Sequence, residues 1–157
     1  MTHEIVFLLK DQLGDQEAQA TKTKVRGLIV AKTSLDPIEV MEKFRSILTE
    51  QPYEFRYALR IVPIERVVAT DLEEIKKATA ELATKIGEDQ SFRVTVEKRF
   101  TELHSRDIIE AAVGDIKRKV DLHNPDWIVQ IEVLGGLTGV SLLKPNDVLA
   151  VVKEKML

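Results

Sequence analysis

The chain has 157 residues, of which 44% are hydrophobic and 31% are charged, as in ordinary folded proteins rather than disordered ones. It contains no cysteine, which excludes a disulfide scaffold, thiol catalysis and cysteine-ligated metal sites. The formal net charge is −3, so the chain as a whole lacks the strongly basic character of many nucleic-acid binders. Residues 91–157 carry ten basic and ten acidic side chains, so a basic surface there must be a local patch.

The N-terminal part begins with a short apolar run, Ile5–Leu9, which we interpret as a strand. It is too short for a membrane span and lacks the basic start of a signal peptide, so we expect a cytoplasmic protein without a membrane partner. The polar stretch Lys10–Lys24 predicts a short helix or a mobile loop. The segment Val25–Lys32 predicts a mostly buried second strand.

A helix start follows at Asp36-Pro37-Ile38-Glu39. Asp36 can cap the free amides of the first turn, and Pro37 occupies a position where its missing N–H costs nothing. The helix is expected to end near Glu50, because Pro52 disfavours helical geometry in the residue before it.

Two extended segments, Phe55–Val62 and Ile64–Ala69, come next and are separated by Pro63. Thr70 is then expected to cap a second helix, which Gly87 terminates. The apolar face of this helix comprises Leu72, Ile75, Thr79, Leu82 and Ile86. The element order up to residue 90 predicts an α+β fold with a ferredoxin-like N-terminal domain, and a domain boundary at Ala69–Thr70.

The second half contains a strand, a helix, a turn and two further strands. Phe92, Val94 and Val96 alternate with polar residues in the first strand. Ser105 is expected to cap a helix whose apolar side continues through Ile116 to Val120, with Gly114 on its polar side. The next elements are the turn Val120–Pro125, the strand Trp127–Val133, a two-glycine hairpin at Gly135-Gly136, the strand Leu137–Leu143, and a final helix Asp147–Lys155 capped by Asn146.

This order of elements, with the residues quoted for it, resembles the THUMP domain, an RNA-binding module of tRNA-modifying proteins. The resemblance implies a ferredoxin-like domain at residues 1–69 followed by a THUMP-like RNA-binding α/β domain at residues 70–157. Within the family, Val120–Pro125 and Val129–Val133 are similar to the stand-alone adaptor that supports tRNA cytidine acetylation, in which a separate acetyltransferase performs the chemistry. The resemblance therefore implies a tRNA-binding protein that is not an enzyme and needs no cofactor.

The candidate RNA-binding patch combines the start of the helix at Ser105 with nearby cations, since backbone amides and basic side chains together suit a phosphate. An alternative is that the basic residues near Lys117 are merely solvated charges that favour the helix dipole. Trp127 is expected to lie in the core or to be half-buried at the strand entry, with base stacking as the alternative. The expected RNA-binding residues are Lys98, Arg99, Ser105, Arg106, Gly114, Lys117, Arg118, Lys119 and Lys144.

Other functions stay open from the residues alone. His104 and His123 lack the neighbouring ligands that would predict a metal site, and no glycine-rich nucleotide-binding motif occurs. A ferredoxin-like fold also occurs in small-molecule sensors and in dimerisation modules, so both of these functions and a homodimer remain alternatives.

Overall fold

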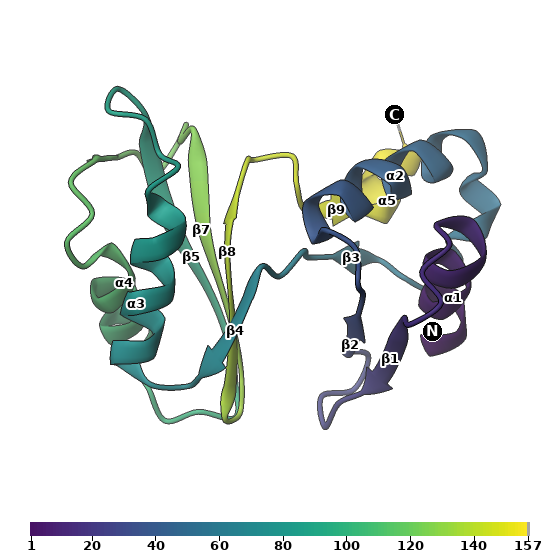
Figure 1. Cartoon of the computed structure of the whole chain (residues 1–157), viewed down its shortest axis with the longest axis horizontal. Coiled ribbons are helices and arrows are strands. Elements are labelled where there is room, and N and C mark those ends of the chain that lie inside the picture. The colour runs from purple at the N-terminus through teal and green to yellow at the C-terminus, as the bar shows by residue number, and fades with distance from the viewer. Residues whose placement is uncertain (157) are drawn as a thin grey trace. The chain divides into compact units, whose positions relative to one another are not determined.

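The computed structural model describes residues 1–156, which form two compact units (Figure 1). The first unit contains residues 1–63 and the segment that begins at Asp147, and the second contains Ile64–Asn146. These units differ from the expected domains 1–69 and 70–157. The difference arises because residues 66–69 pair with a strand of the second unit, whereas residues 149–150 pair with a strand of the first.

The first unit begins with helix α1 (Thr2–Phe7) and a π-helical turn, η1 (Leu8–Gln12). The prediction of a strand at Ile5–Leu9 is therefore wrong. Ile5, Leu8 and Leu9 are all buried in the core of this unit. Their spacing of three and four residues places them on one side of a helix, which explains why a helix forms here.

Strands β1 (Gln19–Lys22) and β2 (Ile29–Lys32) form an antiparallel hairpin, so the expected strand Val25–Lys32 exists only in its second half. The buried Asp15, which precedes β1, links the two ends of this hairpin by binding Thr33 and Ser34, which follow β2. Its carboxylate accepts hydrogen bonds from the Ser34 hydroxyl at 2.6 Å, the Thr33 hydroxyl at 2.5 Å and the Ser34 amide at 2.9 Å. The hydrogen bonds from Ser34 and then Thr33 lower the pKa of Asp15 from 3.8 to about 2.

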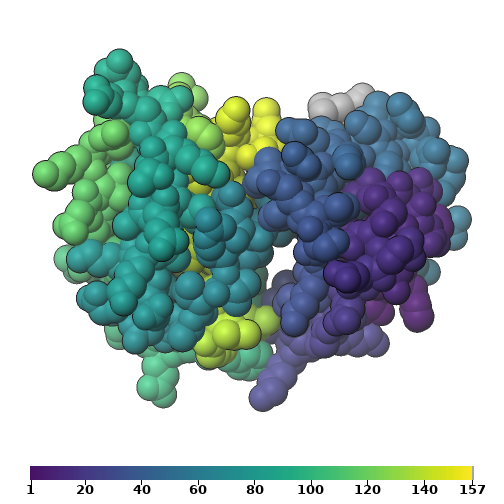
Figure 2. All heavy atoms as spheres, viewed as in Figure 1, coloured from purple at the N-terminus to yellow at the C-terminus, as the bar shows by residue number. Residues whose placement is uncertain are grey.

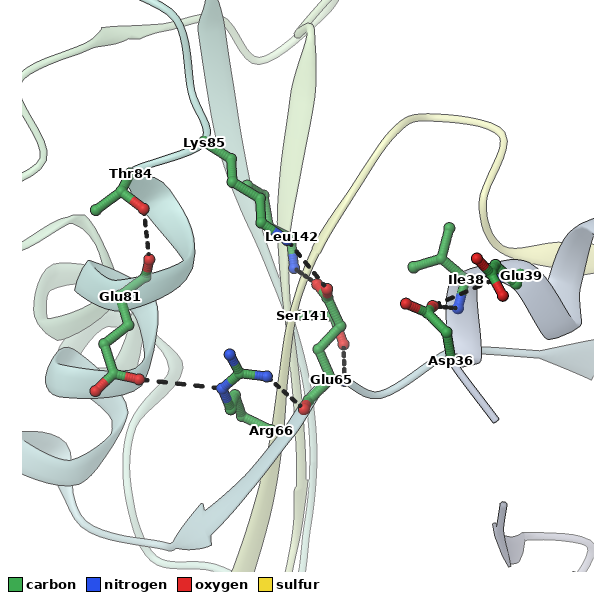
Figure 3. Close-up of polar contacts among 10 residues, drawn as sticks. All are labelled: Asp36, Ile38, Glu39, Glu65, Arg66, Glu81, Thr84, Lys85, Ser141 and Leu142. Carbon is green, nitrogen blue, oxygen red and sulfur yellow. Dashed lines mark hydrogen bonds and ion pairs between the residues drawn. The ribbon is translucent and has the colours of Figure 1, made fainter. Parts of the chain in front are cut away.

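Helix α2 (Pro37–Glu50) has the predicted start and end. The Asp36 side chain accepts hydrogen bonds from the amides of Ile38 and Glu39, as Figure 3 shows. These bonds satisfy two amides that have no partner within the helix. The buried face of α2 comprises Val40, Met41, Phe44 and Leu48.

After a 3₁₀ turn, η2 (Pro52–Glu54), strand β3 (Arg60–Ile61) pairs with β9 (Leu149–Ala150). Helix α5 (Val151–Lys155) follows with Ala150 at its N-cap, so the predicted helix end at Lys155 is confirmed, whereas its predicted start at Asp147 and its Asn146 cap are wrong. Pairing of β9 with β3 uses residues that the prediction assigned to the helix. The described strands of this unit thus form two two-stranded sheets, unlike the four-stranded sheet of a ferredoxin-like sandwich.

The second unit is a five-stranded mixed sheet with the strand order β4-β8-β7-β5-β6. Strand β5 is parallel to both β6 and β7, whereas β8 is antiparallel to β7 and β4. The expected Gly135-Gly136 hairpin connects β7 to β8, and Gly135 has a φ of +57°. The elements are β4 (Arg66–Ala69), α3 (Leu72–Ala83), β5 (Ser91–Arg99), α4 (Ser105–Val113), β6 (Lys119–Val120), β7 (Trp127–Leu134) and β8 (Leu137–Leu143).

Both helices of this unit cover the same face of the sheet (Figure 1), and α3 forms much of the surface visible in Figure 2. The alternation in β5 brings Phe92, Val94 and Val96 towards these helices. They pack with Ile75 of α3 and Ile108 of α4, which are fully buried. The core of the THUMP-like region therefore lies between the sheet and its two helices.

The entry into β4 is fixed by side chains of the same unit (Figure 3). Glu65 donates its amide hydrogen to the Ser141 hydroxyl, and its carboxylate accepts from the Leu142 amide at 2.8 Å. Ile64 lies so close to Gly139 that a Cβ at Gly139 would come within 2.9 Å of the Ile64 side chain. A residue larger than glycine would therefore disturb the junction between β4 and β8.

The cap of α3 is Asp71 rather than the predicted Thr70. The Asp71 carboxylate accepts a hydrogen bond from the Glu73 amide at 2.7 Å. The Thr70 hydroxyl instead hydrogen-bonds with the Thr138 hydroxyl of β8 at 2.9 Å. The choice between two adjacent capping residues thus depends on a neighbouring strand that is distant in the sequence.

Candidate nucleic-acid interface

Helix α4 ends at Val113, not at Val120 as the periodicity predicted. Gly114 is its C-cap, with φ +43° and ψ −122°, a conformation that side-chain-bearing residues rarely adopt. Gly114 is therefore not on the polar face of a longer helix, and Lys117 and Arg118 lie in the following loop. Ile116 still packs against the core from this loop, which explains why the apolar periodicity continued past the true end of the helix.

The start of α4 also differs by one residue from the prediction. His104 is the N-cap and makes no side-chain capping hydrogen bond, while Ser105 is the first helical residue. The Lys98 ammonium donates a hydrogen bond to the carbonyl of Leu103 at 3.0 Å, so it lies next to this helix start. Lys98 and the beginning of α4 are therefore brought together, as the candidate patch requires.

The nine candidate residues do not form one patch, because the structure separates them to two ends of the sheet. Helix α4 starts near the C-terminal end of β5 and runs back about 14 Å, since each of its nine residues advances the helix by about 1.5 Å. The Arg99 end of the sheet contains Lys98, Arg99, Ser105 and Arg106. The Lys119 end contains Gly114, Lys117, Arg118, Lys119 and Lys144, because β6 pairs with the first two residues of β5.

Cations at the Arg99 end interact with groups of the protein itself. Arg99 is half-buried, and its Nη1 lies 3.6 Å from Oε2 of Glu132 on the adjacent strand β7. Arg106 is exposed, and its Nε lies 3.3 Å from Oε1 of Glu110 one helical turn later. Residues 97–110 also contain four acidic and three basic side chains. The Arg99 end is therefore not a positively charged surface, despite its three cations.

At the Lys119 end, Arg118 has a structural role. Its guanidinium Nε donates to the Ile86 carbonyl at 3.1 Å, and its Nη1 donates to the Lys117 carbonyl at 2.8 Å. These bonds attach the loop after α4 to the end of the α3 region. Lys117 and Lys119, on either side, are exposed and form no ion pair within residues 1–156. Their charges are thus available to a partner.

Trp127 and Lys144 complete this end. Trp127 is half-buried at the start of β7, as predicted, and its Nε1 donates to Gln90 Oε1 at 2.8 Å. The Lys144 ammonium lies 5.7 Å from the centre of the indole ring, within cation–π range. Four adjacent strands separate Lys119 from Lys144 by three spacings, or about 14 Å. Lys117, Lys119 and Lys144 therefore lie at the same end of the strands of the sheet.

The turn before β7 contributes two residues that the sequence analysis did not single out. The Asp121 carboxylate accepts hydrogen bonds from the amides of Asn124 at 3.0 Å and His123 at 3.1 Å, and these lower the pKa of Asp121. Arg93 of β5 donates from Nη1 to the Leu122 carbonyl at 3.1 Å. The signal for Asp121 was its position ahead of Asn-Pro, because Asp side chains commonly accept from amides two or three residues later.

No metal-binding cluster is present in the part of the chain that the structure describes, where no three His, Cys, Asp or Glu side chains could share an ion. His104 lies at the Arg99 end, whereas His123 follows Asp121 near the Lys119 end. None of the helices within residues 1–156 is long and apolar enough to cross a membrane.

Comparison with known proteins matches most of the second unit to a protein family. The THUMP domain family model matches residues 69–143. The chain is also 31% identical over 108 residues to the uncharacterized protein MJ0421 of Methanocaldococcus jannaschii. That match covers 62% of this chain and 30% of the relative. The chain therefore spans less than a third of the curated relative that it matches.

Solved structures of the same fold cover both units of the chain. PH1313 from Pyrococcus horikoshii Ot3 is 22% identical and superposes with a TM-score of 0.62 over 92% of this chain and 47% of its own. A 4-thiouridine synthetase in complex with RNA and ATP is 17% identical and superposes with a TM-score of 0.58, over 90% of this chain and 36% of its own. TrmN from Thermus thermophilus is 17% identical and superposes with a TM-score of 0.56, over 90% of this chain and 41% of its own. Residues 69–143 of this chain match the THUMP domain family, and the solved structures share the fold of the chain.

Proposed function

We propose that this chain binds tRNA through its THUMP domain and presents it to a separate modifying enzyme. The observation that carries the proposal is the match of residues 69–143 to the THUMP domain, a module associated with RNA binding in tRNA-modifying proteins. One solved protein of similar fold, a 4-thiouridine synthetase, was crystallised in complex with RNA.

The Lys119 end is the part of the domain that best suits a phosphate backbone. Its exposed lysines, Lys117 and Lys119, form no ion pair within residues 1–156, although the Asp121 carboxylate lies close enough to Lys119 to interact with its charge. At the Arg99 end, by contrast, Glu132 and Glu110 already lie beside the arginines. Phosphate contacts from lysines position RNA without reading its sequence, so this surface would bind many tRNAs.

Binding at this surface should depend strongly on salt. Each lysine that neutralises a phosphate releases about one counterion, which makes the affinity fall as the salt concentration rises. The net charge of −3 gives no general attraction for RNA, so the local lysines have to supply it. Affinity that is lost when only these lysines are replaced would therefore support this surface directly.

The adaptor role is supported by the segments Val120–Pro125 and Val129–Val133, which resemble those of the adaptor for tRNA cytidine acetylation. In the structure, the first segment forms the Asp121 turn and the second lies in the central strand β7. We therefore propose a cytidine acetyltransferase as the enzyme partner, with the chain itself contributing no catalytic group.

The experiment is a tRNA titration at two salt concentrations, followed by incubation with tRNA, acetyl-CoA and ATP and nucleoside analysis by mass spectrometry. We expect tight binding at low salt, clearly weaker binding at high salt, and no acetylcytidine unless an acetyltransferase is added. Acetylcytidine formed by the pure chain would disprove the adaptor role but not RNA binding. Failure to bind tRNA at low salt would disprove the proposed function itself.

A further inference from the structure

The loop after helix α2 in the first unit exposes aromatic side chains on a rigid backbone. Both tyrosines of the chain lie on it, and Tyr53 and Tyr57 are 61% and 63% exposed. Between them, Phe55 is only 1% exposed, and Ala58 after them is 4% exposed. The same short segment therefore places its phenylalanine in the core and both of its tyrosines in solvent. It lies on the surface of this unit in Figure 2.

Several contacts hold this loop in place. The Glu4 carboxylate accepts hydrogen bonds from three consecutive amides, those of Arg56 at 2.6 Å, Tyr57 at 3.1 Å and Ala58 at 2.8 Å. The Lys155 ammonium donates to the Phe55 carbonyl at 2.5 Å. The Phe55 ring meets the Phe44 ring edge to face, with centroids 5.9 Å apart. Contacts from Glu4, Lys155 and Phe44 thus hold the loop backbone in place, and both tyrosines are exposed on an ordered backbone.

A cation lies between the two tyrosines. Arg56 is exposed and donates from Nε to the Tyr53 carbonyl at 3.2 Å, and it forms no ion pair within residues 1–156. The Glu4 carboxylate faces the loop backbone, where three amides surround it, while Glu54 is half-buried. Four residues of chain can span at most about 14 Å, so one short strand of nucleic acid could contact both tyrosines and the arginine.

We infer that Tyr53, Arg56 and Tyr57 form a platform on which unpaired bases of the bound RNA stack. Tyrosine rings accept any base face, and an arginine between them can contact the phosphate that joins two stacked nucleotides. This inference rests on the proposed RNA binding but adds a second contact surface, in the N-terminal unit, and a ligand class, single-stranded rather than paired RNA. Tyrosine and arginine are also common in protein interfaces, so contact with a protein partner is the competing outcome that the test separates from stacking. Leu59 beside them, 65% exposed, provides the matched control.

The test compares two RNA hairpins, one blunt and one with a short single-stranded extension that carries 2-aminopurine, whose fluorescence falls on stacking. The double variant Tyr53→Ala/Tyr57→Ala should bind the extended hairpin more weakly, by roughly fivefold or more for each stacked base, and should leave the 2-aminopurine bright. Its affinity for the blunt hairpin should not change. Tyr53→Phe/Tyr57→Phe keeps the rings and should behave as the wild type, and so should Leu59→Ala. Thermal melting of all variants checks that the exposed substitutions leave folding intact.

The outcomes separate this inference from the function on which it rests. If the wild type binds both hairpins and the double alanine variant binds them equally well, the platform is wrong and RNA binding through the THUMP domain stands. If the wild type binds neither hairpin, the proposed function fails and the platform fails with it. If the alanine variant loses the enzyme partner but not the extended hairpin, the tyrosines contact protein, which also overturns the inference.

Discussion

The two ends of the THUMP sheet contain similar numbers of cations but use them differently. At the Arg99 end, the cations lie beside Glu132, Glu110 and the Leu103 carbonyl. At the Lys119 end, Arg118 holds the loop while Lys117 and Lys119 on either side stay exposed. The difference shows that the number of basic residues near a site does not give the number of charges that a partner can reach. What matters is how many of their charges the fold leaves available.

The strongest test of this comparison replaces the cations at each end separately. Lys117→Ala/Lys119→Ala should weaken tRNA binding and flatten the slope of log affinity against log salt by about two units, because two phosphate contacts are lost. Lys98→Ala/Arg106→Ala, the matched double variant of the Arg99 end, should change the slope by much less than one unit. Equal losses in both variants would show that RNA covers both ends of the sheet. A loss confined to the second variant would reverse our assignment.

The next largest effect concerns Gly114, the C-cap that ends α4. Gly114→Ala should destabilise the protein by about 1–3 kcal/mol, because alanine must adopt a disfavoured conformation and its Cβ would meet the Ala111 carbonyl oxygen at 3.0 Å. Gly136→Ala is the control, since a Cβ there meets nothing within 4 Å, and it should change stability by about 0.5 kcal/mol at most. Urea unfolding measures both. A neutral Gly114→Ala would mean that the helix can continue past residue 114.

Replacing Arg99 tests whether the Arg99 end is structural. Arg99→Met keeps much of the side-chain volume but removes the cation 3.6 Å from the half-buried Glu132 carboxylate. We expect a loss of about 1 kcal/mol in unfolding free energy and an unchanged affinity for tRNA. The same two measurements on Lys119→Met should give the opposite pattern, with stability kept and affinity reduced. Reduced tRNA affinity of folded Arg99→Met would place RNA at this end after all.

The smallest expected effect concerns Asp121, an acidic group near the lysines. Hydrogen bonds from the Asn124 and His123 amides lower its pKa from 3.8, so its stabilisation of the turn is present above pH 3.8 and is lost as the pH falls through the lowered value. A carbon NMR titration of the carboxyl group should therefore give a pKa below 3.8. Asp121→Asn removes a negative charge beside Lys119 and should raise tRNA affinity slightly. A carboxyl pKa at or above 3.8 would contradict the hydrogen-bonded turn.

The sequence predicted local features well where a single residue type determines them. Asp36 caps α2, and Gly135-Gly136 forms the hairpin, because each meets a local geometric requirement. The sequence-based prediction failed where one pattern of apolar residues is compatible with two kinds of local structure. The apolar run Ile5–Leu9 suits a strand or a helix, and the choice depends on its burial against the core of the first unit. Ile116 likewise fits the helical period although it packs from a loop.

The candidate site was less predictable than the fold, because the partners of its charges come from other strands. The pairing of Arg99 with Glu132 depends on the register between β5 and β7, in which Arg99 lies opposite Leu134. The bond from Arg118 to Ile86 joins residues that are 32 positions apart in the chain. Neither contact leaves a signal in the local sequence, so the separation of structural from available cations emerges only from the folded structure.

The discontinuity of the first unit has a consequence for synthesis on the ribosome. Its β9 and α5 come after the whole of the second unit, and β9 pairs with β3 while Val151 donates its amide hydrogen to the Leu59 carbonyl. Residues 1–63 therefore emerge first but lack their last strand and helix until translation has passed residue 150. The THUMP domain, which is continuous in the chain, has all its strands earlier. On the ribosome, the second unit is therefore complete in the chain before the first, so the usual N-to-C order of domain completion is reversed.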